Sequence, residues 1–226
     1  MTSQEVNKAY LSAFGPELGP LYYALENEVV WLHAKWLEYR KLFAKSQKRI
    51  DLLNEASGFF FRVVQDVLWD DVLLHIARLT DPAKQGRFEN LTVARLDLAF
   101  QNSSVGSELS KVVEVVKERA QFAREWRNRR IAHRDLSLAL DLKARPLPGA
   151  SRQHVEDVLA SIREAMNLLR RHFLDSDMGF EHFLVHDDAD LLVHHLSLAL
   201  RTEAQRRARL LAGDRRPEDF ECLPEV

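Results

Sequence analysis

One stretch of the chain gathers residue types that act on phosphate groups. The segment AREWRNRRIAHRDLS, Ala123 to Ser137, holds five arginines and one histidine in fifteen residues. Histidine exchanges protons near neutral pH, so it could activate a ribose 2′-hydroxyl or protonate a leaving oxygen. Arginine stays charged and presents a planar fork of donors to a phosphate on which negative charge builds. These residue types suit metal-independent cleavage of RNA. The alternative interpretation is that the segment forms the solvated basic face of an ordinary helix.

Helix geometry limits how these side chains can cooperate. Arg129 and Arg130 precede His133 by four and three positions, so in a regular helix all three share one face. Arg127, six positions before His133, lies roughly 120° around the helix. Arg127 and His133 therefore converge only if the helix distorts near its end, or if a second subunit supplies one of them across a two-fold axis. Asn128 could orient the substrate or the histidine.

The composition excludes several classes of protein. The 226 residues carry a formal net charge of −2, which excludes a globally basic protein that coats nucleic acid. The single cysteine, Cys222, excludes an intrachain disulfide and a cysteine zinc site. The start of the chain does not resemble a signal peptide, and the most apolar stretch carries four charges, so we expect a cytoplasmic protein without a membrane span.

Helical periodicity dominates the chain and predicts an all-α fold. A first helical segment is expected to stop at Gly15-Pro16, and the long helix over 47–79 is expected to be buried, because it is apolar around most of its circumference. We predict a bundle of long antiparallel helices over residues 1–175, with a C-terminal helical extension and polar tail over 176–226 packed on it. The other expected helices cover about 19–45, 91–100, 104–133, 151–173 and 189–211.

The arginine cluster and two further motifs resemble a known family. The chain is similar to the HEPN superfamily of small all-α proteins, whose ribonucleases carry an arginine, a following polar residue and a histidine; here these are Arg127, Asn128 and His133. The strongest similarity is to the AbiU2-like branch, which is linked to abortive phage infection. It is carried by HIARLTDPAK (75–84) with NLTVARL (90–96), and by WRNRRIAHRD (126–135), and the resemblance covers about 17–173.

The resemblance implies an endoribonuclease whose site forms between two protomers, in phage defence or in a toxin–antitoxin pair. His133 would be the general acid or base, Arg127 would stabilise the phosphate, and Asn128 would position it. RNA, a second copy of the chain and an antitoxin protein are the implied partners, and no cofactor or metal is expected. The RNA-binding residues would be Arg129 and Arg130, with the flanking charges Arg124 and Arg134. The alternative is a non-catalytic HEPN module that binds a partner protein, RNA or nucleotide.

One position departs from the pattern of HEPN toxins. Those controlled by nucleotidyltransferase antitoxins often place a tyrosine two residues after the histidine, and here that position is Asp135. Regulation through such a tyrosine is therefore not supported. His133 could also simply cap the end of a helix, where a cation is favoured.

Two other groups could carry chemistry. His182 and His186 are four positions apart and would allow one metal ion if that stretch were helical, but the glutamate of an HExxH motif is absent. Asp70, Asp71 and Asp81 could form a structural acidic counterpart to the arginine cluster across the bundle. For His75, on a strongly apolar helix, a hydrogen-bonded core histidine is favoured over a ligand.

Overall fold

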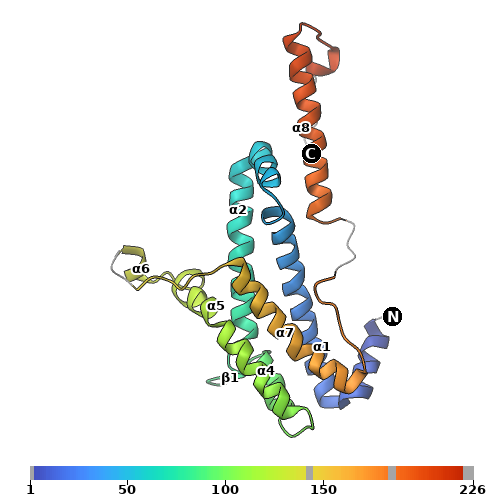
Figure 1. Cartoon of the computed structure of the whole chain (residues 1–226), viewed down its shortest axis with the longest axis vertical. Coiled ribbons are helices and arrows are strands. Elements are labelled where there is room, and N and C mark those ends of the chain that lie inside the picture. Colours follow the sequence, from blue (N-terminus) through green and yellow to red (C-terminus); the bar gives the residue numbers. More distant parts are fainter. Residues whose placement is uncertain (1–2, 141–144, 183–186, 221–226) are drawn as a thin grey trace. The chain divides into compact units, whose positions relative to one another are not determined.

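The structure, a computed structural model, describes residues 3–140, 145–182 and 187–220. Helices form almost all of the regular structure in these ranges, so the all-α prediction is confirmed (Figure 1). The strands β1 and β2 form a two-stranded antiparallel hairpin in which Lys84 pairs with Glu89. In chain order the elements are α1 (Ser3–Phe43), α2 (Gln47–Leu79), β1 (Lys84–Gln85), β2 (Phe88–Glu89), α3 (Val93–Phe100), α4 (Gly106–Arg119), α5 (Gln121–Trp126), the π-helix η1 (Arg127–Ile131), α6 (Leu136–Leu140), α7 (Arg152–Leu174), α8 (Ala189–Leu211) and the 3₁₀-helix η2 (Pro217–Phe220).

The chain divides into two compact units. The first comprises Met1–Leu37 with Asp66–Leu184, and the second comprises Glu38–Gln65 with Val185–Val226. The arginine cluster lies wholly in the first unit. The second unit contains most of the predicted extension and also the segment 38–65, at the junction of α1 and α2. The domain boundary at residue 175 stays a prediction.

Antiparallel packing organises the first unit. Between α1 and α2, Lys35 Nζ lies 2.7 Å from Asp71 Oδ2, and Glu28 Oε2 lies 3.0 Å from His75 Nε2. From Glu28 to Lys35 the residue number rises along α1, while the number of the partner on α2 falls from His75 to Asp71, as in antiparallel helices. The same pattern joins α1 to α7, where the Tyr22 hydroxyl donates to Met166 O at 3.1 Å, and Trp36 Nε1 donates to a Glu156 carboxylate oxygen at 2.8 Å. The predicted bundle of long antiparallel helices is thus present.

Apolar stripes build the core of this unit. On α4 the buried residues Leu109, Val113 and Val116 recur at four- and three-residue spacing, and Ala120 and Ala123 continue the stripe. Each fully buried leucine or valine stabilises the fold by about 1.5–3 kcal/mol. Helix α7 presents the matching face, with Val155, Val158, Leu159, Ile162, Ala165, Met166 and Leu169 buried.

Local signals place several helix ends. The predicted stop at Gly15-Pro16 is a kink within α1, because Gly15 has φ 83° and ψ 172°, in the region that favours glycine. The Thr92 side chain accepts a hydrogen bond from Arg95 N and caps α3. Ser151 caps α7 in a capping box with His154.

Two expectations are wrong. The predicted helix over 104–133 is not continuous: it breaks at Ala120 between α4 and α5, and it continues as η1. Helix α2 is also not buried throughout, since Phe59 is 84% exposed and Phe60 58% exposed. The apolar character of a helix is readable from sequence, but the neighbours that cover each of its sides are not.

Candidate active site at the end of α5

The helix that carries the motif changes geometry at the motif itself. From Arg127 to Ile131 the backbone forms a π-helix, in which hydrogen bonds span five residues instead of four. Ala132 N donates to Arg127 O at 2.8 Å, and Asp135 N donates to Arg129 O at 3.0 Å, where the turn ends. Short π-helical segments occur frequently at functional sites. A distortion near the helix end, one of the two conditions for cooperation between Arg127 and His133, is therefore present.

Two partners orient the Arg127 guanidinium. Its Nη1 forms an ion pair with Asp81 Oδ2, and its Nε donates to Asn128 Oδ1 at 2.9 Å. Both charged side chains are mostly shielded, with 21% of Arg127 and 17% of Asp81 exposed. A guanidinium has five N–H donors, so the bonds to Asp81 and Asn128 leave donors for a further acceptor. Because Arg127 is fixed along two edges, a phosphate would meet a donor group that is already oriented.

A second arginine holds the turn that carries Asp81. Arg124 Nη1 donates to Thr80 O at 3.3 Å and to Thr80 Oγ1 at 3.2 Å. Its Nη2 donates to Lys117 O at 2.6 Å and to Gln121 Oε1 at 2.8 Å. Arg124, predicted to bind RNA, thus directs its donors at the protein and connects the end of α2 to α4 and α5.

His133 follows the π-helix and is exposed. Within the ranges that the structure describes, its ring has no hydrogen-bond partner, and no hydrogen bond joins it to Arg127 or Asn128. The structure thus brings Arg127 and Asn128 together and leaves the imidazole open to solvent. An exposed imidazole is accessible to a substrate or to a second protein chain.

The other arginines of the motif line a pocket of about 340 Å³. The lining combines four charged residues with four apolar ones: Arg129, Arg130, Arg134, Asp135, Leu138, Ala139, Pro146 and Leu147. Three cations against one carboxylate make this pocket suitable for phosphate oxygens. Arg134 is exposed, and no side chain in the described part of the chain pairs with it.

Neighbouring contacts shape this pocket. Trp126 Nε1 donates to Pro148 O at 2.9 Å, and Arg129 Nη2 donates to Arg145 O at 2.8 Å, which holds the segment after α6 against η1. The Arg130 guanidinium lies 5.0 Å from the centre of the Trp126 ring, within cation–π range. The sequence analysis did not predict this contact, although the position of Trp126 directly before the motif was a signal.

Asp135 is also part of the local framework. Its Oδ1 accepts from Leu138 N at 2.8 Å and caps α6, and its Oδ2 lies 3.5 Å from Arg129 Nε. The bond from Leu138 N, with a smaller contribution from Arg129, lowers the pKa of Asp135. The carboxylate therefore balances part of the pocket's positive charge.

The acidic residues expected opposite the arginines have different partners. Asp81 pairs with Arg127, while Asp71 pairs with Lys35 at 2.7 Å. Burial raises the pKa of Asp70, and the charge of Arg130 opposes this shift, so Asp70 lies within electrostatic range of η1. The expected counterpart is thus present for Asp81 and Asp70 but not for Asp71.

Three further histidines were considered in the sequence, and the structure gives one of them, His75, a structural role. His75 is 3% exposed, and its Nε2 lies 3.0 Å from Glu28 Oε2, as expected for a hydrogen-bonded core histidine. Burial, the largest cause, lowers its pKa. Of the two histidines considered for a metal, His182 is exposed and His186 lies outside the described residues.

The comparisons with known proteins agree with the motifs. The HEPN_AbiU2 family model, described as AbiU2, matches residues 15–195. No curated protein and no solved structure shows a significant match. Across the described residues, the helices are too short or too polar to cross a membrane. Since the family model covers most of the sequence, the chain belongs to the AbiU2 family of HEPN proteins.

Proposed function

We propose that this protein is a metal-independent endoribonuclease of phage defence or of a toxin–antitoxin pair, acting in the cytoplasm. The observation that carries the proposal is the Arg127 guanidinium, which Asp81 and Asn128 hold in one orientation with donors to spare. Preorganised donors stabilise the charge that develops on a phosphate in the transition state, because no reorganisation is needed during the reaction.

The site divides the chemistry among its residues. His133 is the general acid or base, and its exposure gives a ribose 2′-hydroxyl or a leaving oxygen access to the ring. Arg127 binds the scissile phosphate, and Asn128 fixes the guanidinium through its side-chain oxygen. Arg129, Arg130 and Arg134 bind neighbouring phosphates along their pocket. Arg124 contributes indirectly, by holding the turn that carries Asp81.

The working site is shared by two protomers. In one chain Arg127 turns to Asp81, and His133 has no bond to it in the described structure. A two-fold axis near η1 would place the His133 of one protomer beside the Arg127 of its partner, and two equivalent sites would result. An antitoxin protein that covers this surface would block both sites.

Cleavage of RNA in the presence of EDTA tests the proposal. The purified protein should cleave total RNA, and His133→Ala should abolish cleavage, whereas His182→Ala, which removes an exposed histidine elsewhere in the same unit, should not. Circular dichroism and thermal unfolding should show that both variants keep the fold. Cleavage that survives His133→Ala overturns the mechanism. RNA binding without any cleavage by the unmodified protein would instead support the non-catalytic module.

A further inference from the structure

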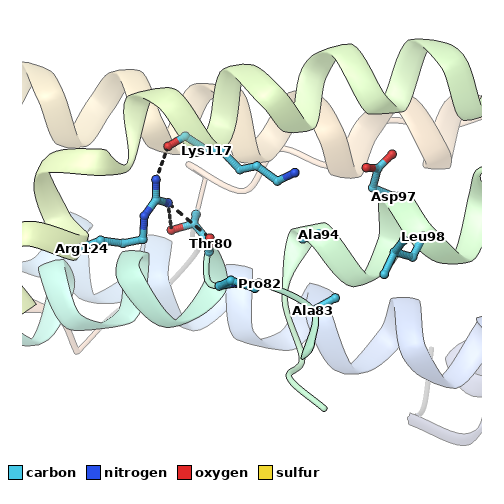
Figure 2. A pocket seen from close by; sticks show the side chains of 8 residues that line it. All are labelled: Thr80, Pro82, Ala83, Ala94, Asp97, Leu98, Lys117 and Arg124. Carbon is cyan, nitrogen blue, oxygen red and sulfur yellow. Dashed lines mark hydrogen bonds between the residues drawn. The ribbon is translucent and has the colours of Figure 1, made fainter. Parts of the chain in front are cut away.

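A second pocket, of about 450 Å³, lies beside the turn that carries Asp81 (Figure 2). Its lining comes from the turn after α2 and from α3, α4 and α5. Its lining residues are Thr80, Pro82, Ala83, Ala94, Asp97, Leu98, Lys117 and Arg124. Of these residues only Arg124 also contributes to the proposed cleavage site, and it does so indirectly, by holding the turn that carries Asp81.

Small apolar side chains form much of its wall. Ala83 and Ala94 are buried and short, which leaves room between α3 and the turn after α2. Leu98 is 52% exposed and lines the pocket next to Asp97. Ligand pockets in proteins combine such apolar walls with a few placed polar groups, and their volumes begin near 300 Å³. The size and the walls suit a compact apolar body.

Within the described residues, the Arg124 guanidinium forms no hydrogen bond or ion pair with a carboxylate, although the Asp81 carboxylate is near enough to act on its charge. All four of its hydrogen bonds go to neutral oxygens, namely two of Thr80, the carbonyl of Lys117 and the amide of Gln121. Burial lowers the pKa of Arg124, and nearby Arg127 adds to this effect while Asp81 opposes it. A charge in this situation favours a nearby anion.

Lys117 adds a second cation with a weakly held partner. Its Nζ lies 2.7 Å from Glu114 Oε1, but Glu114 is 70% exposed, and such surface pairs contribute little. Figure 2 shows the Lys117 side chain reaching along the pocket toward the Asp97 side. Asp97 itself accepts a hydrogen bond from Ser110 Oγ at 2.5 Å. The lining therefore carries two cations and one carboxylate.

We propose that this pocket binds a small organic monoanion, a carboxylate or a phosphodiester attached to a compact apolar body. One negative charge neutralises the net charge of the lining, while Asp97 disfavours a second negative charge. The anionic group lies between Lys117 and Arg124, and the apolar body lies against Pro82, Ala94 and Leu98. A carboxylate and a phosphodiester both carry a single negative charge, and titration with one probe of each kind distinguishes between them.

Binding in this pocket is linked to the arginine motif through two adjacent residues, Thr80 and Asp81. Thr80, which Arg124 holds, directly precedes Asp81, which holds Arg127. An anion that attracts the Arg124 guanidinium weakens the hydrogen bonds from Arg124 to Thr80, and this changes the position of Asp81. This effect on cleavage rests on the proposed function, whereas the binding does not.

Calorimetric titration of the His133→Ala protein, without RNA, tests the binding. The probes are benzoate and methyl phenyl phosphate, with acetate and benzyl alcohol as controls that lack the apolar body or the charge. At least one probe should bind with a Kd of about 1 mM or below, and both controls should bind at least about tenfold more weakly. Because cleavage is not measured, failure of the proposed function leaves this result unaffected.

The exposed Leu98 and the half-buried Lys117 provide variants that keep the fold. Lys117→Gln and Leu98→Gln should each weaken binding about tenfold, since each removes one required contact. Lys111→Gln, an exposed lysine of the same helix outside the pocket, should not change it. The proposal is overturned if neither probe binds saturably, if benzyl alcohol binds as tightly as the anions, or if Lys111→Gln weakens binding as much as Lys117→Gln.

Discussion

Arg127 and Asp81 are 46 residues apart in the chain and form a partly buried ion pair at the centre of the candidate site. Asp81 lies in the turn after α2, and Arg127 begins the π-helix that carries the motif. The pair joins two motifs that the family resemblance had placed in separate stretches of sequence. It makes Arg127 a residue of the fold as well as of the proposed chemistry.

The two roles predict different effects on stability. Arg127→Ala should lower the free energy of unfolding by about 1–3 kcal/mol, because Asp81 is then left shielded without its partner. His133→Ala removes an exposed side chain and should change it by less than about 0.5 kcal/mol. Urea unfolding of both variants checks this, with Arg134→Ala as an exposed arginine control. Equal destabilisation by Arg127→Ala and Arg134→Ala would contradict the role of the pair.

A mixing experiment tests whether the site is shared between protomers. Arg127→Ala and His133→Ala should each be inactive alone. In a mixed dimer, one of the two sites combines the intact arginine of one protomer with the intact histidine of its partner. Random reassembly of equal amounts should therefore restore about one quarter of the normal cleavage activity. If the mixture stays inactive although mixed dimers form, the site lies within one chain.

The arginine pocket predicts the salt dependence of RNA binding. Each phosphate contact with single-stranded nucleic acid contributes about 0.7 to the slope of log affinity against log salt. The measurement uses the His133→Ala protein, so that the RNA stays intact. Adding Arg134→Ala to it removes an exposed arginine of the pocket, which should weaken RNA binding and reduce the slope by about 0.7. Fluorescence anisotropy over a salt series measures it. Lys111→Ala serves as the control, and an equal change there would show that only general charge matters.

His33 predicts a loss of stability in mild acid. It is 3% exposed, its Nδ1 lies 2.8 Å from Val29 O, and its Nε2 lies 3.3 Å from Arg163 Nη1. Burial, the largest cause, lowers its pKa to about 4. The unfolded chain, where the pKa is near 6.5, binds the proton more readily, so stability is complete above about pH 6.5 and falls as the pH drops toward 4.

Between about pH 7 and about pH 5, this histidine should account for a loss of about 2 kcal/mol in the free energy of unfolding. The lowered pKa of His75 acts in the same direction. Urea unfolding at both pH values checks the effect, and His33→Asn should make the protein less sensitive to pH in this range. Equal sensitivity in His33→Asn and in the unmodified protein would show that His33 is not the cause.

Sequence alone determined the features that depend on neighbouring residues. The predicted bounds of α2 and α8 agree with the structure, because apolar periodicity and end signals act within one or two turns. The side chains of Thr92 and Ser151 cap their helices through backbone N–H groups only three residues further along the chain. The motif residues Arg127, Asn128 and His133 were matched in the sequence through its resemblance to HEPN proteins, and their roles stay predictions.

Only the tertiary structure decided which distant groups meet. The partner of Arg127 is on the turn after α2, and the donors of Arg124 are satisfied by Thr80 and α4, contacts that no local spacing encodes. The π-helix at 127–131 and the exposure of Phe59 likewise emerge only in the folded chain. The physical reason is range: helices form from contacts three and four residues apart, whereas pairing and burial depend on elements that folding brings together.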